Sequence, residues 1–199
     1  MTNNMQAANG NGGETDRDMV TSLFRRLSLG TLGLLLAASI AGVLTAPGDL
    51  WANDERPEEG HLAPDFALKT LEGKTVRLSE LRGKKVALIN FWATWCPPCR
   101  FEMPTMQKIY SEYKGKGLEI LAVNIEPDAN QEIREFMKEL RLTFPVLLDP
   151  DMKVTRNYRV FGVPVSMLID HQGIIRARDF GYRDWTDKES RRQVENLLK

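Results

Sequence analysis

Cysteine and histidine are scarce in this sequence, which holds two of each among 199 residues, and neither sign of charge is in excess. A structural zinc site needs four Cys or His ligands at characteristic spacings, and neither His61 nor His171 has such a spacing from the cysteines. The basic surplus of residues 61–199, 23 Lys and Arg against 19 Asp and Glu, is too small to indicate nucleic-acid binding. Internal repeats and heptads are also absent from the sequence.

The N-terminal quarter of the chain differs in composition from the rest. Residues 1–24 form a leader, polar and rich in Asn and Gly through Ser22, that we expect to be disordered. Two arginines then precede an uncharged run that ends at Gly48, and we interpret residues 25–46 as a transmembrane signal anchor or a signal peptide. A run of this length can cross the ~30 Å hydrocarbon core of a bilayer.

Two outcomes for residues 25–46 stay open. The long polar leader and the length of the span favour an anchor that is retained, whereas Ser39-Ile40-Ala41 has the small-x-small form of a cleavage site, and Met19 would give a short basic leader. In either case the arginines lie on the N-terminal side and acidic residues follow the span, which predicts an extracytoplasmic or periplasmic C-terminal domain on the cytoplasmic membrane. Residues 47–61 read as a linker, and the folded domain is predicted over 62–199.

The domain alternates strand-like and helix-like segments. Strand patterns are followed by helix patterns and then by an antiparallel hairpin and a last helix, which predicts an α/β fold with a mixed central sheet. The predicted elements are a hairpin over 63–81, strands over 84–94, 117–126 and 144–149, helices over 97–113, 129–141 and 151–159, a hairpin over 165–180 and a helix over 187–198.

Both cysteines lie in one stretch, FWATWCPPCRFEMP, at the end of a buried strand. The following helix begins just past Cys96, so its free N–H groups and its macrodipole favour a Cys96 thiolate, the form that attacks a disulfide. Pro97 and Pro98 lack an N–H and fit the first helical turn, where none is needed. Cys99, one turn further on, is predicted to be the more buried partner. Redox chemistry is favoured over a copper-binding thiol pair, a structural disulfide and a zinc site.

Three motifs in a fixed order carry a resemblance to a known family. APDF, NFWATWCPPCRFEMP and GVPVSMLID, spread over 62–199, resemble the TlpA/ResA group of membrane-anchored extracytoplasmic thiol–disulfide oxidoreductases in the thioredoxin superfamily. The resemblance implies a thioredoxin-like fold with helices flanking the sheet, an N-terminal β-hairpin and an inserted helix and strand between residues 126 and 149. It implies a redox-active disulfide between Cys96 and Cys99, and it implies neither a cofactor nor a metal ion.

The resemblance also assigns roles to individual residues. Pro164 would be a cis proline opposite the cysteines, and it would leave the main chain of Val163 free to pair with an extended substrate. Glu102, on the helical face of Cys99, would handle the proton of that thiol, the alternative being a solvated surface carboxylate. Asn90 replaces the titrating aspartate of thioredoxin. We place Trp95, Pro97 and Pro98 with Val163 and Pro164 on the substrate-binding surface.

The function that follows from the resemblance is that of a protein-disulfide reductase. Its substrates would be apocytochrome c or a copper-delivery protein, its electrons would come from a membrane thiol donor, and a monomer is the default. Three alternatives stay open: a protein-thiol oxidant, because the cysteine motif does not set the direction of electron flow, a copper-binding module, and a thiol peroxidase. A thiol peroxidase would have a threonine three residues before the reactive cysteine, whereas this chain has Ala93 at that position.

Overall fold

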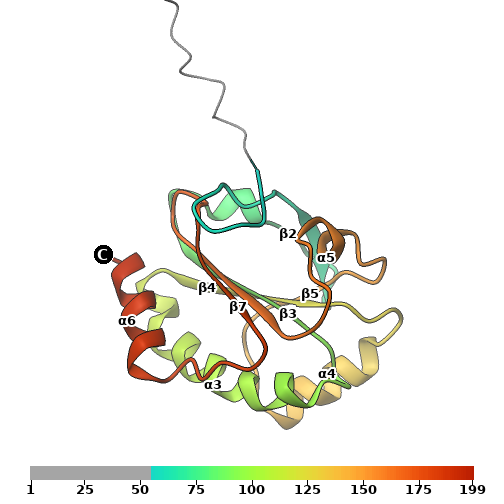
Figure 1. Ribbon diagram of the computed structural model, residues 1–199. Helices are drawn as coiled ribbons and strands as arrows, with labels where there is room; N and C mark the ends of the chain where they lie inside the picture. Colours follow the sequence, from blue (N-terminus) through green and yellow to red (C-terminus); the bar gives the residue numbers. More distant parts are fainter. Residues whose placement is uncertain (1–54) are drawn as a thin grey trace, which may run out of the picture. The chain divides into compact units, whose positions relative to one another are not determined.

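The computed structural model describes residues 55–199 (Figure 1). The predicted leader, the predicted anchor or signal peptide and the first part of the predicted linker lie outside the described residues. Between residues 55 and 199, no helix is both long enough and apolar enough to cross a membrane.

A seven-stranded mixed sheet forms the centre of the fold, in the order β2-β1-β5-β4-β3-β6-β7. The three strands β3, β4 and β5 are parallel, and the remaining neighbours pair antiparallel. The N-terminal hairpin joins the sheet through the inserted strand β5, as β1 pairs with it. The strands are β1 (Ala67–Thr70), β2 (Thr75–Arg77), β3 (Val86–Trp92), β4 (Leu118–Asn124), β5 (Val146–Leu148), β6 (Val165–Ile169) and β7 (Ile175–Phe180).

Helices cover both faces of the sheet. One hydrophobic cluster packs α3, α4 and α6 on one face, and a second packs η1 and α5 on the other (Figure 1). The helices are η1 (Leu78–Leu81), α3 (Pro97–Tyr113), η2 (Lys114–Lys116), α4 (Asn130–Glu139), α5 (Lys153–Asn157) and α6 (Lys188–Leu197). Every predicted element is present, so the predicted α/β fold with its mixed sheet, N-terminal hairpin and inserted helix and strand is confirmed.

The central strand β3 is buried along its whole length, which explains its continuous apolar sequence. Its side chains alternate between the two clusters, with Leu88 and Trp92 facing α3 and Ile89 and Phe91 facing the opposite layer. By the same alternation, Asn90 faces α3. A polar side chain is therefore placed beneath the helix that carries both cysteines.

The last part of the predicted linker is attached to the folded domain. The Gly60 N–H donates to the Ile175 carbonyl over 2.9 Å, and the Ile175 N–H donates to the His61 carbonyl over 3.0 Å. The Arg178 guanidinium donates to the Pro57 carbonyl, and Pro57 is buried. Residues 55–61 thus belong to the folded unit, and the boundary predicted at residue 62 lies too far along the chain.

Candidate active site

The two cysteines lie where β3 leads into α3. Cys96 is the N-cap of the helix and is joined to Cys99 by a disulfide, with the Cα atoms 5.3 Å apart. Pro97 and Pro98 occupy the first helical turn, and the first available helical N–H, that of Cys99, donates to the Cys96 sulfur over 3.2 Å. Cys96 is 3% exposed and Cys99 is fully buried, so an incoming reagent can reach only the first sulfur.

A second loop approaches Cys96 from the start of β6. The Val163–Pro164 peptide bond is cis, and the Val163 carbonyl oxygen lies 3.6 Å from the Cys96 sulfur. Because that sulfur is in the disulfide and carries no hydrogen, this is a contact rather than a hydrogen bond. Within residues 55–199 the main chain of Val163 makes no main-chain hydrogen bond, so both of its polar groups can bind an added strand.

A groove of about 660 Å³ is lined by Val163 of this loop and by Trp95, the residue before the first cysteine. Two exposed aromatic side chains border it, with Trp95 65% exposed and Phe161 96% exposed. The groove is otherwise lined mainly by Ile125, Glu126, Pro127, Met152, Arg156, Val160 and Val163. Trp95 and Val163, both predicted to be on the substrate-binding surface, line this groove, and its other lining residues were not predicted from the sequence.

Beneath the cysteines, Glu102 is fully buried in a polar cluster on the α3 side of the sheet. The Trp185 indole N–H donates to Glu102 Oε1 over 2.8 Å, and the Ser166 hydroxyl donates to the same oxygen over 3.2 Å. The Asn90 amide donates to Ser166 over 2.8 Å and to Glu102 Oε2 over 3.3 Å. The surface-carboxylate alternative for Glu102 is therefore wrong.

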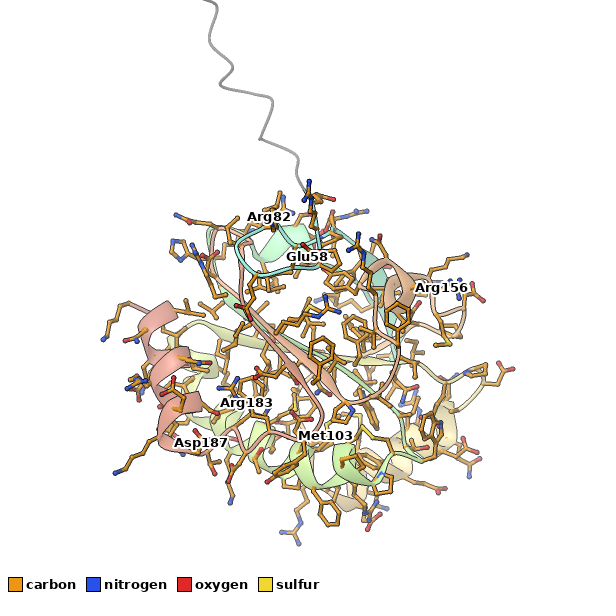
Figure 2. All side chains as sticks on the ribbon, viewed as in Figure 1. Glu58, Arg82, Met103, Arg156, Arg183 and Asp187 are labelled. Atoms are coloured by element: carbon orange, nitrogen blue, oxygen red, sulfur yellow. A yellow bond between two sulfur atoms is a disulfide. The ribbon has the colours of Figure 1, made fainter. Side chains whose placement is uncertain are left out.

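Trp185, which holds the buried carboxyl, is itself fixed by its neighbours. The Arg183 guanidinium (labelled in Figure 2) stacks over the indole ring, 4.5 Å from the ring centroid. The main-chain N–H of Trp185 donates to the Thr105 hydroxyl of α3 over 3.1 Å. Ser166 lies in the GVPVSMLID motif, but nothing in the local sequence around Trp185 points to a role beside Glu102, 83 residues away.

Burial raises the pKa of Glu102 to about 7, although the hydrogen bonds from Trp185, Ser166 and Asn90 act in the opposite direction. The Asn90 Oδ1 atom has no hydrogen-bond partner within the described part of the chain. If the amide were rotated by 180°, Oδ1 would face Glu102 Oε2 and could accept a hydrogen bond from the neutral carboxyl group. The cluster therefore suits a carboxyl group that gains and loses a proton near neutral pH.

We expect this buried carboxyl to make the free energy of unfolding depend on pH. Its folded pKa is about 7, against 4.5 for a glutamate side chain in water, so its contribution is fully present below pH 4.5 and is lost as the pH rises through 7. The loss should be about 3 kcal/mol. Urea unfolding of the disulfide-bonded protein at several pH values measures it, and Glu102→Gln should remove this component. An unchanged pH dependence in that variant would contradict the assignment.

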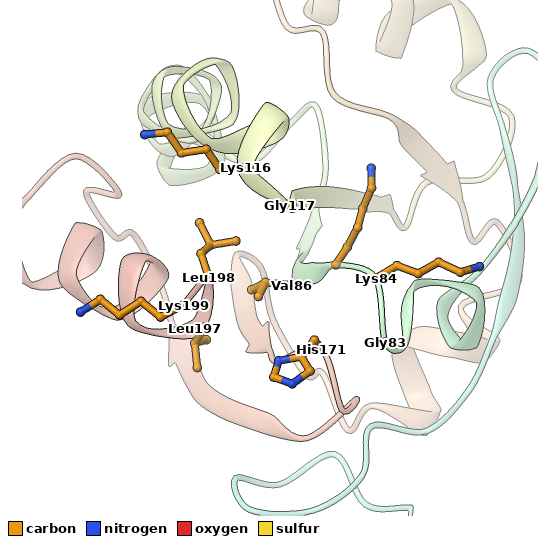
Figure 3. A pocket seen from close by; sticks show the side chains of 10 residues that line it. Gly83, Lys84, Val86, Lys116, Gly117, His171, Leu197, Leu198 and Lys199 are labelled. Carbon is orange, nitrogen blue, oxygen red and sulfur yellow. The ribbon is translucent and has the colours of Figure 1, made fainter.

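A second hollow, of about 260 Å³, lies at the other end of the sheet (Figure 3). It is bordered by Val86 at the start of β3 and by Gly117 just before β4, whereas the cysteines follow the far end of β3. Lysines and His171 line it, and neither cysteine does. Within residues 55–199 no group of three or more His, Cys, Asp or Glu side chains is placed to hold a metal ion.

A dithiol–disulfide pair at the N-terminus of a helix, beside a cis-proline loop on a thioredoxin-like sheet, defines a thiol–disulfide oxidoreductase. Residues 60–178 match the model of the AhpC/TSA family. The chain belongs to this thioredoxin-like family, and its similarity to named relatives supports the same enzyme class.

Several curated relatives carry the name thiol-disulfide oxidoreductase ResA. The protein of Bacillus thuringiensis (strain Al Hakam) is 36% identical over 174 residues, 87% of this chain and 95% of its own. That of Bacillus subtilis (strain 168) is 41% identical over 149 residues, 75% of this chain and 82% of its own. Among solved structures, a thiol:disulfide interchange protein of the thioredoxin family from Chlorobium tepidum TLS matches with a TM-score of 0.60 and 29% identity, over 69% of this chain and 96% of its own.

Proposed function

We propose that this thiol–disulfide oxidoreductase reduces disulfides in protein substrates. The observation that carries the proposal is the position of the Cys96 sulfur, 3.6 Å from the carbonyl of Val163, a residue whose main chain is available for strand pairing. A substrate segment paired with Val163 would bring its own disulfide onto Cys96. Trp95, Pro97, Pro98 and Pro164 would form the surface around it.

In the proposed reaction two electrons pass from the cysteine pair to the substrate. The Cys96 thiolate attacks one substrate sulfur, the substrate S–S bond breaks, and the second substrate sulfur leaves as a thiolate that takes up a proton. The Cys99 thiolate then attacks the Cys96 sulfur of the mixed disulfide and releases the first substrate sulfur. The products are a substrate dithiol and the Cys96–Cys99 disulfide.

Glu102 is proposed as the group that accepts the proton of Cys99. It lies three residues beyond Cys99 on α3, and both side chains are fully buried, so water cannot readily take that proton. Its pKa of about 7 is suited to accept a proton and to return it at neutral pH.

The direction of electron flow depends on how strongly the protein stabilises the reduced pair, because a stabilised thiolate makes the disulfide a strong oxidant. The Cys99 N–H and the helix N-terminus stabilise a Cys96 thiolate. The buried carboxylate of Glu102 opposes negative charge on the same cysteine pair and so supports a reductant.

We further propose that the protein works outside the cytoplasm as a monomer, held to the cytoplasmic membrane by residues 25–46. The arginines before the uncharged run support this orientation. The family resemblance supports apocytochrome c or a copper-delivery protein as the substrate, and a membrane thiol protein as the electron donor. An anchored enzyme would meet a membrane-bound donor in two dimensions.

The reduction potential of the Cys96–Cys99 pair tests the proposed direction. The full-length protein, equilibrated with glutathione and dithiothreitol buffers at pH 7, should show a potential near or below about −250 mV, in the range of thioredoxin-like reductants. A value near about −120 mV, as in strong disulfide oxidants, would reverse the direction. Reduction of insulin disulfides provides the accompanying activity measurement.

A further inference from the structure

The loop before Cys96 is held by a carboxylate from a neighbouring strand. The Thr94 N–H donates to Glu126 Oε2 over 2.6 Å, and the Thr94 hydroxyl donates to Glu126 Oε1 over 2.7 Å. Both oxygens of one side chain thus bind one residue, 32 positions earlier in the chain and two positions before the first cysteine. Hydrogen bonds to an ionised carboxylate are among the stronger ones in proteins.

Glu126 is itself fixed to the end of the sheet. Asn124, the last residue of β4, is fully buried, and its amide donates to Glu126 Oε2 over 2.9 Å while its Oδ1 accepts the Glu126 N–H over 2.9 Å. The Asn124 carbonyl accepts the Asp149 N–H over 2.9 Å, which ties this corner to the end of β5. The carboxylate is therefore held in a defined position rather than free in solvent.

The residue between Thr94 and Cys96 is Trp95, whose side chain is 65% exposed and borders the groove beside Cys96. Within the described residues, the main chain of the loop over 93–95 makes one other main-chain hydrogen bond, in which the Cys96 N–H donates to the Ala93 carbonyl over 3.3 Å. We propose that Glu126 is a positioning residue that acts through Thr94 to hold Trp95 in place for a protein disulfide arriving at Cys96. This inference rests on the proposed function and extends it to a residue outside the cysteine helix.

Glutamine at position 126 separates geometry from charge. Its carbonyl oxygen can accept from the Thr94 N–H and from Asn124, and its NH₂ group can donate to the Thr94 hydroxyl, which then acts as acceptor. Glu126→Gln therefore keeps the contacts and removes the charge, whereas Glu126→Ala removes both. A positioning role predicts that these two variants differ, and an electrostatic influence on the Cys96 thiol predicts that they behave alike.

The test is steady-state reduction of insulin by the full-length wild-type protein and the two variants, with iodoacetamide alkylation of reduced Cys96 as a control for the thiol itself. Glu126→Ala should raise KM about tenfold, as expected for loss of a charge-assisted hydrogen bond. Its alkylation rate should stay within about twofold, because Cys96 keeps its helix N-terminus. Glu126→Gln should restore KM, and Thr94→Val, which removes the hydroxyl, should raise it.

A wild-type KM in Glu126→Ala, or equal losses in Glu126→Ala and Glu126→Gln, would overturn the inference. So would a fall in alkylation that matches the loss in insulin reduction. Hydrogen exchange of the residue 94 amide, measured by NMR, gives a readout that does not depend on activity. It should accelerate in Glu126→Ala and stay slow in Glu126→Gln, and equal protection in both would also overturn the inference. An inactive wild-type protein with this exchange pattern would contradict the proposed function alone.

Discussion

Cys96→Ala should abolish the reduction of insulin disulfides, because it removes the one sulfur of the pair that an incoming disulfide can reach. Cys99 is fully buried and cannot replace it. Cys99→Ala should leave the first attack intact and accumulate a mixed disulfide between Cys96 and the substrate, since the resolving thiol is missing. Turbidity of reduced insulin measures the first effect, and mass spectrometry of the trapped adduct measures the second.

These two variants control for each other, because each removes the same disulfide and any general loss of stability is shared. Multiple turnover in Cys96→Ala would contradict the assignment of Cys96 as the attacking thiol. Adducts in Cys96→Ala but not in Cys99→Ala would reverse the order of the two cysteines.

Glu102→Gln should slow the resolution of a mixed disulfide about 100-fold at pH 8, because the amide cannot accept the proton that Cys99 loses. In the wild-type protein the rate should rise as the pH passes through about 7, where Glu102 becomes ionised and able to act as a base. The Glu102→Gln variant should show no such rise in rate near pH 7. Stopped-flow release of a chromophoric thiol from a preformed mixed disulfide measures both quantities.

Glu112→Gln is the matched control for this experiment. Glu112 lies on the same helix, but its side chain is 42% exposed and pairs with Arg191 on the surface. It should resolve the mixed disulfide at the wild-type rate. The proton role of Glu102 would be wrong if Glu102→Gln kept the step near pH 7 or lost no more rate than Glu112→Gln.

The N-terminal end of the cysteine helix was predictable from the sequence because it depends on residues next to one another. Two prolines fit the first turn of a helix, and the buried strand that precedes them indicates that the helix begins just past Cys96. The same locality made the hairpin over residues 63–81 and the buried strand β3 predictable from turn residues and apolar runs. The motif containing Pro164 placed the second loop by resemblance, and the structure has this proline in cis.

The environment of Glu102 was decided only by the tertiary structure. In the sequence this residue could equally be a solvated carboxylate on the surface of α3, because helical periodicity does not say what covers a given face. Its burial depends on Asn90, Ser166 and Trp185, which lie 12, 64 and 83 residues away along the chain. Desolvation is a property of everything packed around a group, so the pKa of about 7 follows only from the folded arrangement.

The contact between Thr94 and Glu126, and the attachment of residues 55–61 to β7, have the same origin. Each joins segments that are distant in sequence: Thr94 and Glu126 meet because the neighbouring strands β3 and β4 bring their ends together, and residues 55–61 meet β7 through main-chain hydrogen bonds. The sequence by itself therefore predicted the cysteine pair and the helix that holds it, since local spacing decides both. The tertiary structure decided which carboxyl groups lie beneath and beside them, because burial and long-range hydrogen bonding arise only on folding.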